Sequence, residues 1–124
     1  MELGTRRFGD ALVLSAEGRI DHATAEAFRV SLFSHLDTCT AGRDRVVLDM
    51  SAVEYVASVG LRALMLAHRR VKAEGGVLVV AALQPVVFEI FEISRFSMIL
   101  RVFPTVREAI AAVAPSSLAA YDAA

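Results

Sequence analysis

The chain of 124 residues has one cysteine, no tryptophan and three prolines, and its charges almost cancel. A lone Cys39 can form no internal disulfide and is no metal site by itself, so a reducing, cytoplasmic compartment is expected. The formal net charge of -1 argues against a nucleic-acid partner, which favours a distinctly basic protein. The longest unbroken apolar run, 77–83, is far shorter than the roughly 20 residues of a membrane helix. We therefore expect no direct membrane insertion.

The composition is that of a folded protein. Apolar residues make up 56% of the chain and charged residues 22%, which is incompatible with intrinsic disorder. No linker rich in proline, glycine or serine divides the sequence, so we expect one domain over residues 1–113. The alanine-rich end, 114–124, is expected to be a flexible C-terminal tail.

Strand-like and helix-like segments alternate along the chain. Two strand-like segments, 3–8 and 11–17, flank Gly9 and Asp10 and predict a hairpin. The later alternation of strands with helices predicts crossover connections and parallel strands. The expected fold class is therefore α/β, with a mixed, mainly parallel sheet, an N-terminal hairpin and about four α-helices.

Local signals place the later elements. Asp21 is expected to cap a helix that runs from about 22 to 38. Residues 51–57 are expected to form a loop, and the best helical pattern follows it and ends at Gly75. The other expected elements are strands at 46–48, 77–82 and 98–103, a helix at 85–93, and a last helix opened by the capping box Thr105 to Glu108.

Residue types that carry catalysis form no recognisable pattern in this sequence. The three histidines lack the spacing of metal ligands, and no glycine-rich phosphate loop or Gly-x-Ser-x-Gly segment is present. Asp49 and Glu54 could act as an acid–base pair, but a structural role for Asp49 in the following loop is the simpler interpretation. We therefore expect a protein that is not an enzyme and uses neither a metal nor a cofactor.

Ser58 stands out because it lies where a strand and loop lead into a helix. Its hydroxyl suits an N-cap, a role worth about 1 kcal/mol. The same position suits a phosphate, because a helix N-terminus has free amides and a partial positive charge. Phosphorylation would add nearly two negative charges beside the apolar Ala57 and Val59 and repel a docked apolar partner. Both interpretations are compatible with the sequence.

Five segments in order resemble the STAS domain of bacterial anti-sigma factor antagonists. The resemblance covers about residues 3 to 113 and is carried by GRIDHATAE at 18–26, VVLDMSAVEYV at 46–56, SVGL at 58–61, GGVLVV at 75–80 and VFPTVREA at 102–109.

The resemblance implies a partner-switching role in transcription regulation. In that family the unphosphorylated protein binds an anti-sigma factor, often itself an ATP-binding serine kinase, and the sigma factor is freed. Phosphorylation, expected here at Ser58, ends the binding, and a phosphatase of the PP2C type reverses it. The partner-binding residues that the resemblance implies are Asp21, Ala57, Ser58, Val59, Gly60 and Arg62.

This sequence departs from the family pattern at two positions beside Ser58, and Arg19 stands where the family often has glutamate. Ala57 stands where the family usually has aspartate, and Val59 stands where it has a second serine or threonine. Two other roles therefore stay open: a cytoplasmic STAS subunit of a membrane lipid-transport complex, and a stressosome-like scaffold.

Overall fold

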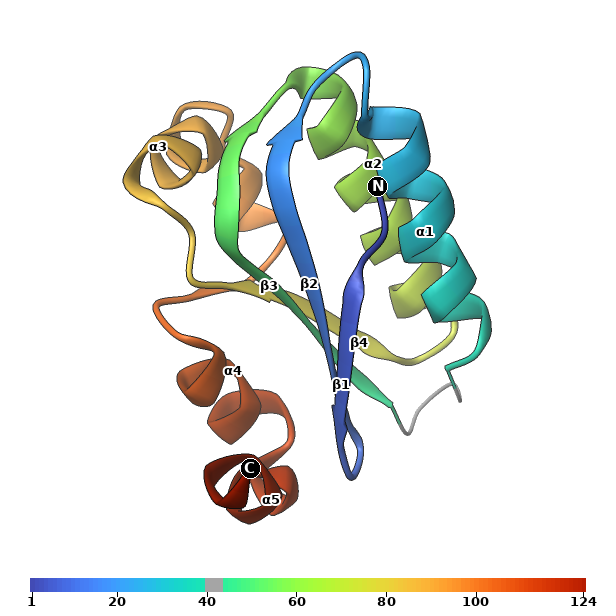
Figure 1. Ribbon diagram of the computed structural model, residues 1–124, viewed down its shortest axis with the longest axis vertical. Coiled ribbons are helices and arrows are strands. Elements are labelled where there is room, and N and C mark those ends of the chain that lie inside the picture. Colours follow the sequence, from blue (N-terminus) through green and yellow to red (C-terminus); the bar gives the residue numbers. More distant parts are fainter. Residues whose placement is uncertain (40–43) are drawn as a thin grey trace.

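The computed structural model describes residues 1–39 and 44–124 and shows an α/β fold built on one sheet (Figure 1). The sheet has five strands in the order β1-β2-β3-β4-β5. The first pair is antiparallel and the other three pairs are parallel, which confirms the predicted fold class. The strands are β1 (Gly4–Phe8), β2 (Ala11–Ile20), β3 (Arg45–Val56), β4 (Val77–Ala81) and β5 (Val102–Phe103).

Helices cover both faces of the sheet. Two lie against one face, α1 (Ala25–Asp37) and α2 (Ser58–Ala73), and α4 (Val106–Val113) covers the other with α5 (Leu118–Ala123) (Figure 1). The short α3 (Pro85–Ile93) follows β4 and packs beside β3. The described residues thus form five α-helices, where the sequence predicted about four.

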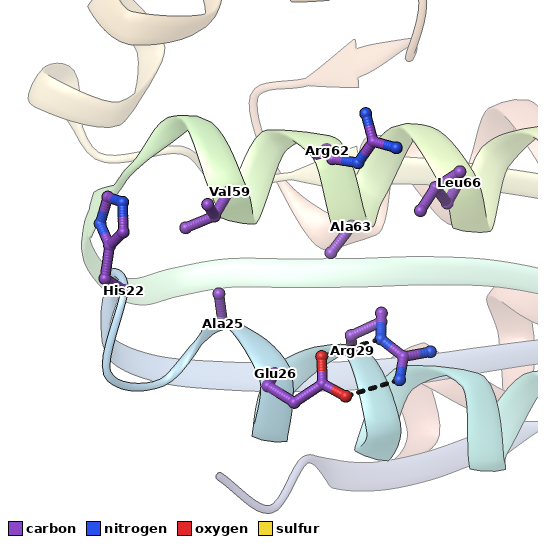
Figure 2. A pocket seen from close by; sticks show the side chains of 8 residues that line it. All are labelled: His22, Ala25, Glu26, Arg29, Val59, Arg62, Ala63 and Leu66. Atoms are coloured by element: carbon purple, nitrogen blue, oxygen red, sulfur yellow. Dashed lines mark hydrogen bonds and ion pairs between the residues drawn. The ribbon is translucent and has the colours of Figure 1, made fainter.

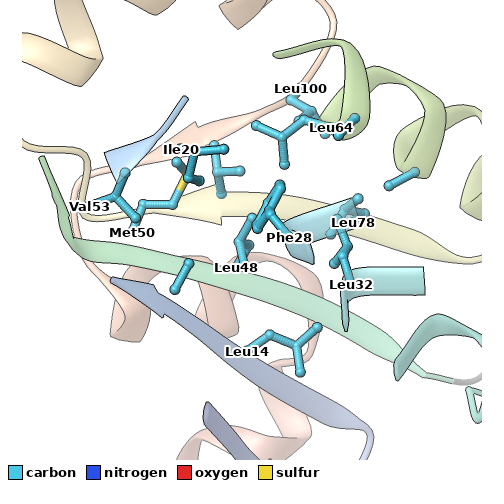
Figure 3. Close-up of a cluster of buried hydrophobic side chains, with 14 of the residues drawn as sticks. Leu14, Ile20, Phe28, Leu32, Leu48, Met50, Val53, Leu64, Leu78 and Leu100 are labelled. Carbon is cyan, nitrogen blue, oxygen red and sulfur yellow. The ribbon is translucent and has the colours of Figure 1, made fainter. Parts of the chain in front are cut away.

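The pleat of the strands divides the buried side chains between two cores. In β3, Val46 and Leu48 face the core beneath α1 and α2, while Val47 between them faces the core beneath α4. The larger core also contains Phe28 and Leu64 from the two helices (Figure 3). Because both faces are covered there, the central stretches 11–14 of β2, 46–48 of β3 and 78–81 of β4 are apolar and do not alternate with polar residues.

Two sequence predictions about this sheet are wrong. Residues 51–56 of the expected loop 51–57 form the second half of β3, because β2 continues beside them and pairs Ile20 with Val56. Asp49 therefore lies within a strand, where its carboxylate accepts the N–H of Ser51 at 3.0 Å. The expected strand 98–103 contains only β5, since the chain first forms a 3₁₀ turn, Phe96–Met98, that buries Phe96.

The C-terminal segment differs from the flexible tail that its composition suggested. Residues Pro115–Ser117 form a 3₁₀ turn and α5 follows. The Tyr121 ring meets the Phe8 ring edge-on at 5.2 Å, and the Asp122 carboxylate accepts two N–H groups of the Arg107 guanidinium, each at 3.0 Å. Packing against β1 thus orders a segment whose alanines gave no sign of it.

No helix in the described ranges 1–39 and 44–124 is long and apolar enough to cross a membrane.

Candidate functional site

The paired ends of β2 and β3 bring two turns together at one end of the molecule. Ile20 is the register partner of Val56, and the N–H of Ala57 donates to the Ile20 carbonyl oxygen at 2.8 Å. Asp21 and Ser58, which are far apart in the sequence, each follow directly from this paired end. The tertiary structure therefore places these two predicted site residues on neighbouring turns.

Ser58 is the first residue of α2, and its side chain is exposed. The N-cap is Ala57, whose extended backbone precedes the helix and whose carbonyl oxygen accepts the N–H groups of Gly60 and Leu61. The predicted N-cap role of Ser58 is therefore wrong by one position, because the backbone turn begins at Ala57. The first turn of α2 carries no acidic residue that would neutralise the positive end of its dipole.

Gly60 allows α2 to lie close against the ends of the two strands. A Cβ atom at this position would lie 2.7 Å from Ile20 Cγ2 and 2.9 Å from Val56 Cγ1. Real Cβ atoms do not approach other atoms so closely, so a larger residue would push the helix start away from the sheet. Gly60 is thus a packing residue that sets the position of Ser58.

The Asp21 carboxylate orders the turn before α1. Its Oδ1 accepts the N–H of Ala23 at 3.0 Å, while the Thr24 hydroxyl accepts the Asp21 N–H and donates to the Arg19 carbonyl oxygen. The hydrogen bond from Ala23 lowers the pKa of Asp21, and the contacts with Thr24 and Arg19 act in the same direction. The predicted N-cap role of Asp21 is wrong, because α1 begins at Ala25 and Thr24 is its N-cap.

Arg19 connects this turn to the end of β3. Its guanidinium lies 3.7 Å from the Asp21 carboxylate and 4.5 Å above the ring centroid of Tyr55. Both contacts are at the surface, where such interactions are weak individually but limit the number of conformations available to the turn.

A groove of about 390 Å³ lies between α1 and α2 next to these turns (Figure 2). It is lined by His22, Ala25, Glu26, Arg29, Val59, Arg62, Ala63 and Leu66. Arg29 is held by a bidentate ion pair with Glu26, whereas the side chain of Arg62 has no hydrogen-bond or ion-pair partner among the described residues. The groove therefore combines an apolar floor with an available positive charge.

The predicted site residues divide between this groove and the turns beside it. Val59 and Arg62 line the groove, while Asp21, Ala57 and Ser58 belong to the turns. Sequence reasoning did not assign to the site the groove residues of α1 and of the turn before it. Two local signals were available: His22 directly follows Asp21, and Glu26 and Arg29 have the i,i+3 spacing of a helical ion pair.

The arrangement is suited to binding a protein and to accepting a group on an exposed hydroxyl. Over the described ranges, no group of three or more His, Cys, Asp or Glu side chains could hold a metal ion. Cys39 is distant in sequence from both turns, and burial raises the pKa of its thiol, which lowers its thiolate fraction and hence its reactivity.

Comparison with known proteins gives consistent results. The STAS domain family model matches residues 3–109. The chain is 35% identical over 120 residues to BtrV of Bordetella bronchiseptica, a protein named as a proposed anti-sigma factor antagonist, with 95% of this chain and 98% of BtrV covered.

Solved structures agree on the fold. The crystal structure of an anti-sigma factor antagonist from Mycobacterium paratuberculosis is similar, with a TM-score of 0.79 and 26% identity over 90% of this chain and 92% of that one. A sulfate transporter family protein from Wolinella succinogenes has the same fold, with a TM-score of 0.70 and 19% identity over 84% of each chain. With its sheet order, its paired turns and these matches, the chain belongs to the STAS domain family.

Proposed function

We propose that this protein is an anti-sigma factor antagonist that acts by binding and performs no catalysis of its own. Its partner is an anti-sigma factor that is also an ATP-binding serine kinase, and binding frees a sigma factor for transcription. The names of the Bordetella and Mycobacterium relatives support this role, since both match nearly the whole chain at more than 25% identity.

The observation that carries the proposal is the exposed Ser58 hydroxyl at the start of the 16-residue helix α2. Its neighbours in the chain are the buried Ala57 and the half-buried Val59, so both residues that flank it in the chain are apolar. A phosphate on Ser58 would be tolerated by the free protein because of the helix dipole and the lack of acidic residues in the first turn. The same phosphate would disfavour an apolar partner surface through its charge and its hydration.

The partner surface proposed here consists of the two turns and the adjoining groove. Ala57, Ser58, Val59 and Gly60 provide the start of α2, and Asp21 provides a carboxylate. Arg62 provides a positive charge that has no partner in the described part of the chain. A partner that meets this surface needs an apolar patch with an acidic group opposite Arg62. Ion pairs of this kind contribute more to specificity and association rate than to affinity.

The test uses three variants of the full chain as baits for proteins from the source cells. Ser58→Ala and the control Ser116→Asp, an exposed serine beside α5, are expected to capture an ATP-binding serine kinase, and Ser58→Asp is not. The captured kinase is then titrated against protein that carries phosphoserine at position 58. Equal affinity for phosphorylated and unmodified protein would contradict the switch.

Two outcomes would favour the other roles of STAS domains. Capture of permease and ATPase subunits by all three baits would make the chain a subunit of a membrane transport complex. Elution as large particles in size-exclusion chromatography would indicate a stressosome-like scaffold. Mapping of phosphopeptides from native protein, before and after treatment with a PP2C-type phosphatase, checks separately that Ser58 is the modified residue.

A further inference from the structure

Helix α3 is apolar on nearly every side although it lies at the surface. Only Glu89 and Glu92 interrupt its sequence PVVFEIFEI, and only Val87 and Phe91 are buried. Five of the six exposed large hydrophobic side chains among the described residues lie in α3 or the turn that follows it. These five, which we call the α3 face, are Val86, Phe88, Ile93, Met98 and Ile99. An apolar face of this kind is typical of a surface that another molecule covers.

The α3 face has both projecting side chains and a hollow. Ile93 is 81% exposed and Met98 is 82% exposed, so both project from the surface. Beside them lies a groove of about 480 Å³, lined mainly by Leu83, Phe88, Val102, Phe103 and Pro104, with Glu92 on its wall. An isoleucine or methionine side chain is chemically suited to this apolar groove.

Two charged side chains lie on this surface, one at the groove and one between the projecting side chains. Glu92 lines the groove, while Arg95 lies in the chain between the projecting Ile93 and Met98. Within the part of the chain that the structure describes, neither the Glu92 carboxylate nor the Arg95 guanidinium has a hydrogen-bond or ion-pair partner. If the projecting side chains of one molecule entered the groove of another, Arg95 would be brought toward Glu92.

We propose that the α3 face binds a second copy of this chain in a two-fold symmetric dimer. In such an interface each copy provides the same surface, so the projections of one copy fill the groove of the other, twice. The two Glu92–Arg95 contacts across the interface would pair charges that have no partner among the described residues of one copy. The carboxylates of Glu89 and Glu92 disfavour an anionic membrane as the occupant, because like charges would repel.

The size of the α3 face indicates a reversible dimer. A stable interface buries about 800 Å² on each partner, and α3 with the following turn provides a short surface. We therefore expect association in the micromolar range. This inference does not depend on the proposed function, because it involves neither Ser58 nor the groove between α1 and α2.

Sedimentation velocity of the full chain, from low to high micromolar concentration, tests the proposal. The wild-type protein is expected to shift from monomer to dimer. Ile93→Glu and Met98→Glu each place a charge in the apolar contact and should raise the dimer dissociation constant at least about tenfold. Val30→Glu is the matched control, since Val30 on α1 is the remaining exposed large hydrophobic among the described residues and should leave the dimer unchanged.

A charge exchange tests the paired residues directly. Glu92→Arg and Arg95→Glu are each expected to weaken the dimer, and the double variant should recover most of the loss because each copy again presents both charges. Circular dichroism checks that every variant is folded. Wild-type protein that stays monomeric at all concentrations would overturn the proposal and assign the α3 face to a different protein. Equal weakening by Val30→Glu, or no recovery in the double variant, would overturn this geometry.

Two measurements on the Ser58→Asp variant, binding of the anti-sigma factor and dimer formation, distinguish this proposal from the proposed function. That variant is expected to lose the anti-sigma factor and keep the dimer, whereas Met98→Glu is expected to lose the dimer. A normal dimer together with a failed switch would therefore reject only the proposed function.

Discussion

Helices α2 and α3 both begin where a parallel strand ends, but they differ in how many of their apolar side chains they bury. The 16-residue α2 buries small and aliphatic residues on one side, Gly60, Ala63, Leu64, Ala67 and Val71, and exposes charged residues such as Arg62 on the other. The 9-residue α3 buries two residues and exposes several apolar side chains. The apolar side of α2 is thus covered by the rest of the fold, and its start presents one exposed hydroxyl. The apolar side chains of α3 remain exposed and can contact a partner.

The two helices also end differently. Gly75 follows α2 with a φ of 76°, and Arg95 follows α3 in the same left-handed region with a φ of 58°. Glycine adopts this conformation without a steric cost, but a residue with a Cβ is strained there by roughly 1–2 kcal/mol. A strained residue at the edge of the α3 face is consistent with a side chain retained for its charge.

The largest difference in the free energy of unfolding is expected between substitutions on the buried side and on the exposed side of α3. Phe91 is fully buried and meets the Phe96 ring edge-on at 5.2 Å, whereas Ile93 is 81% exposed. We expect Phe91→Ala to lower the free energy of unfolding by about 3–5 kcal/mol and Ile93→Ala by less than about 0.5 kcal/mol in dilute, monomeric protein. Urea denaturation measures both, and similar losses would show that Ile93 belongs to the core of the monomer.

A smaller loss in the free energy of unfolding is expected from a substitution where α2 meets the sheet. Gly60→Ala would bring a methyl group against Ile20 and Val56, and we expect a net loss of about 1–2 kcal/mol after the better helix propensity of alanine is included. In the control Gly4→Ala, the new Cβ would lie at an ordinary 3.6 Å from Ser15 Cβ, with a change below about 0.5 kcal/mol. An unchanged free energy of unfolding in Gly60→Ala would show that α2 can move away from Ile20 without loss of stability.

The smallest change in the free energy of unfolding is expected from substitutions at the ends of the two helices. Arg95→Gly is expected to raise the free energy of unfolding by about 1 kcal/mol, and Gly75→Ala to lower it by about the same amount. A Cβ at Gly75 meets nothing within 4 Å, so backbone strain alone is measured there. Thermal unfolding of dilute protein gives both values, and shifts of the same sign would contradict the comparison.

Local signals in the sequence were sufficient for much of the fold. The hairpin at Gly9, the glycine that follows the end of α2 at position 75 and the first-turn position of Pro85 were all predicted correctly. The Thr105 hydroxyl accepts the Glu108 N–H at 3.1 Å, as expected from the capping box. Each of these features depends on residues a few positions apart, so the amino-acid types alone can reveal it.

The candidate site required more than local signals. Sequence placed Ser58 among the candidates by its position before a helix, and Asp21 and Arg62 through a family resemblance. It could not show that Asp21 precedes α1 by a full turn or that Ala57 is the cap of α2. It also gave no sign that β3 would continue beside β2 as far as Val56. These features arise from pairing between segments about 35 residues apart in the chain, which no local pattern encodes.

The sequence by itself determined the order of strands and helices as far as α4, the covered apolar strand segments and the position of an exposed serine near a helix start. Only the tertiary structure decided which side chains share a surface: Ser58 beside the Asp21 turn, the groove between α1 and α2, and the uncovered α3 face. The reason is physical. Hydrophobic periodicity specifies that a side chain is to be buried, but the segment that buries it depends on how distant parts of the chain pack. For the α3 face, residues 1–39 and 44–124 do not provide that segment.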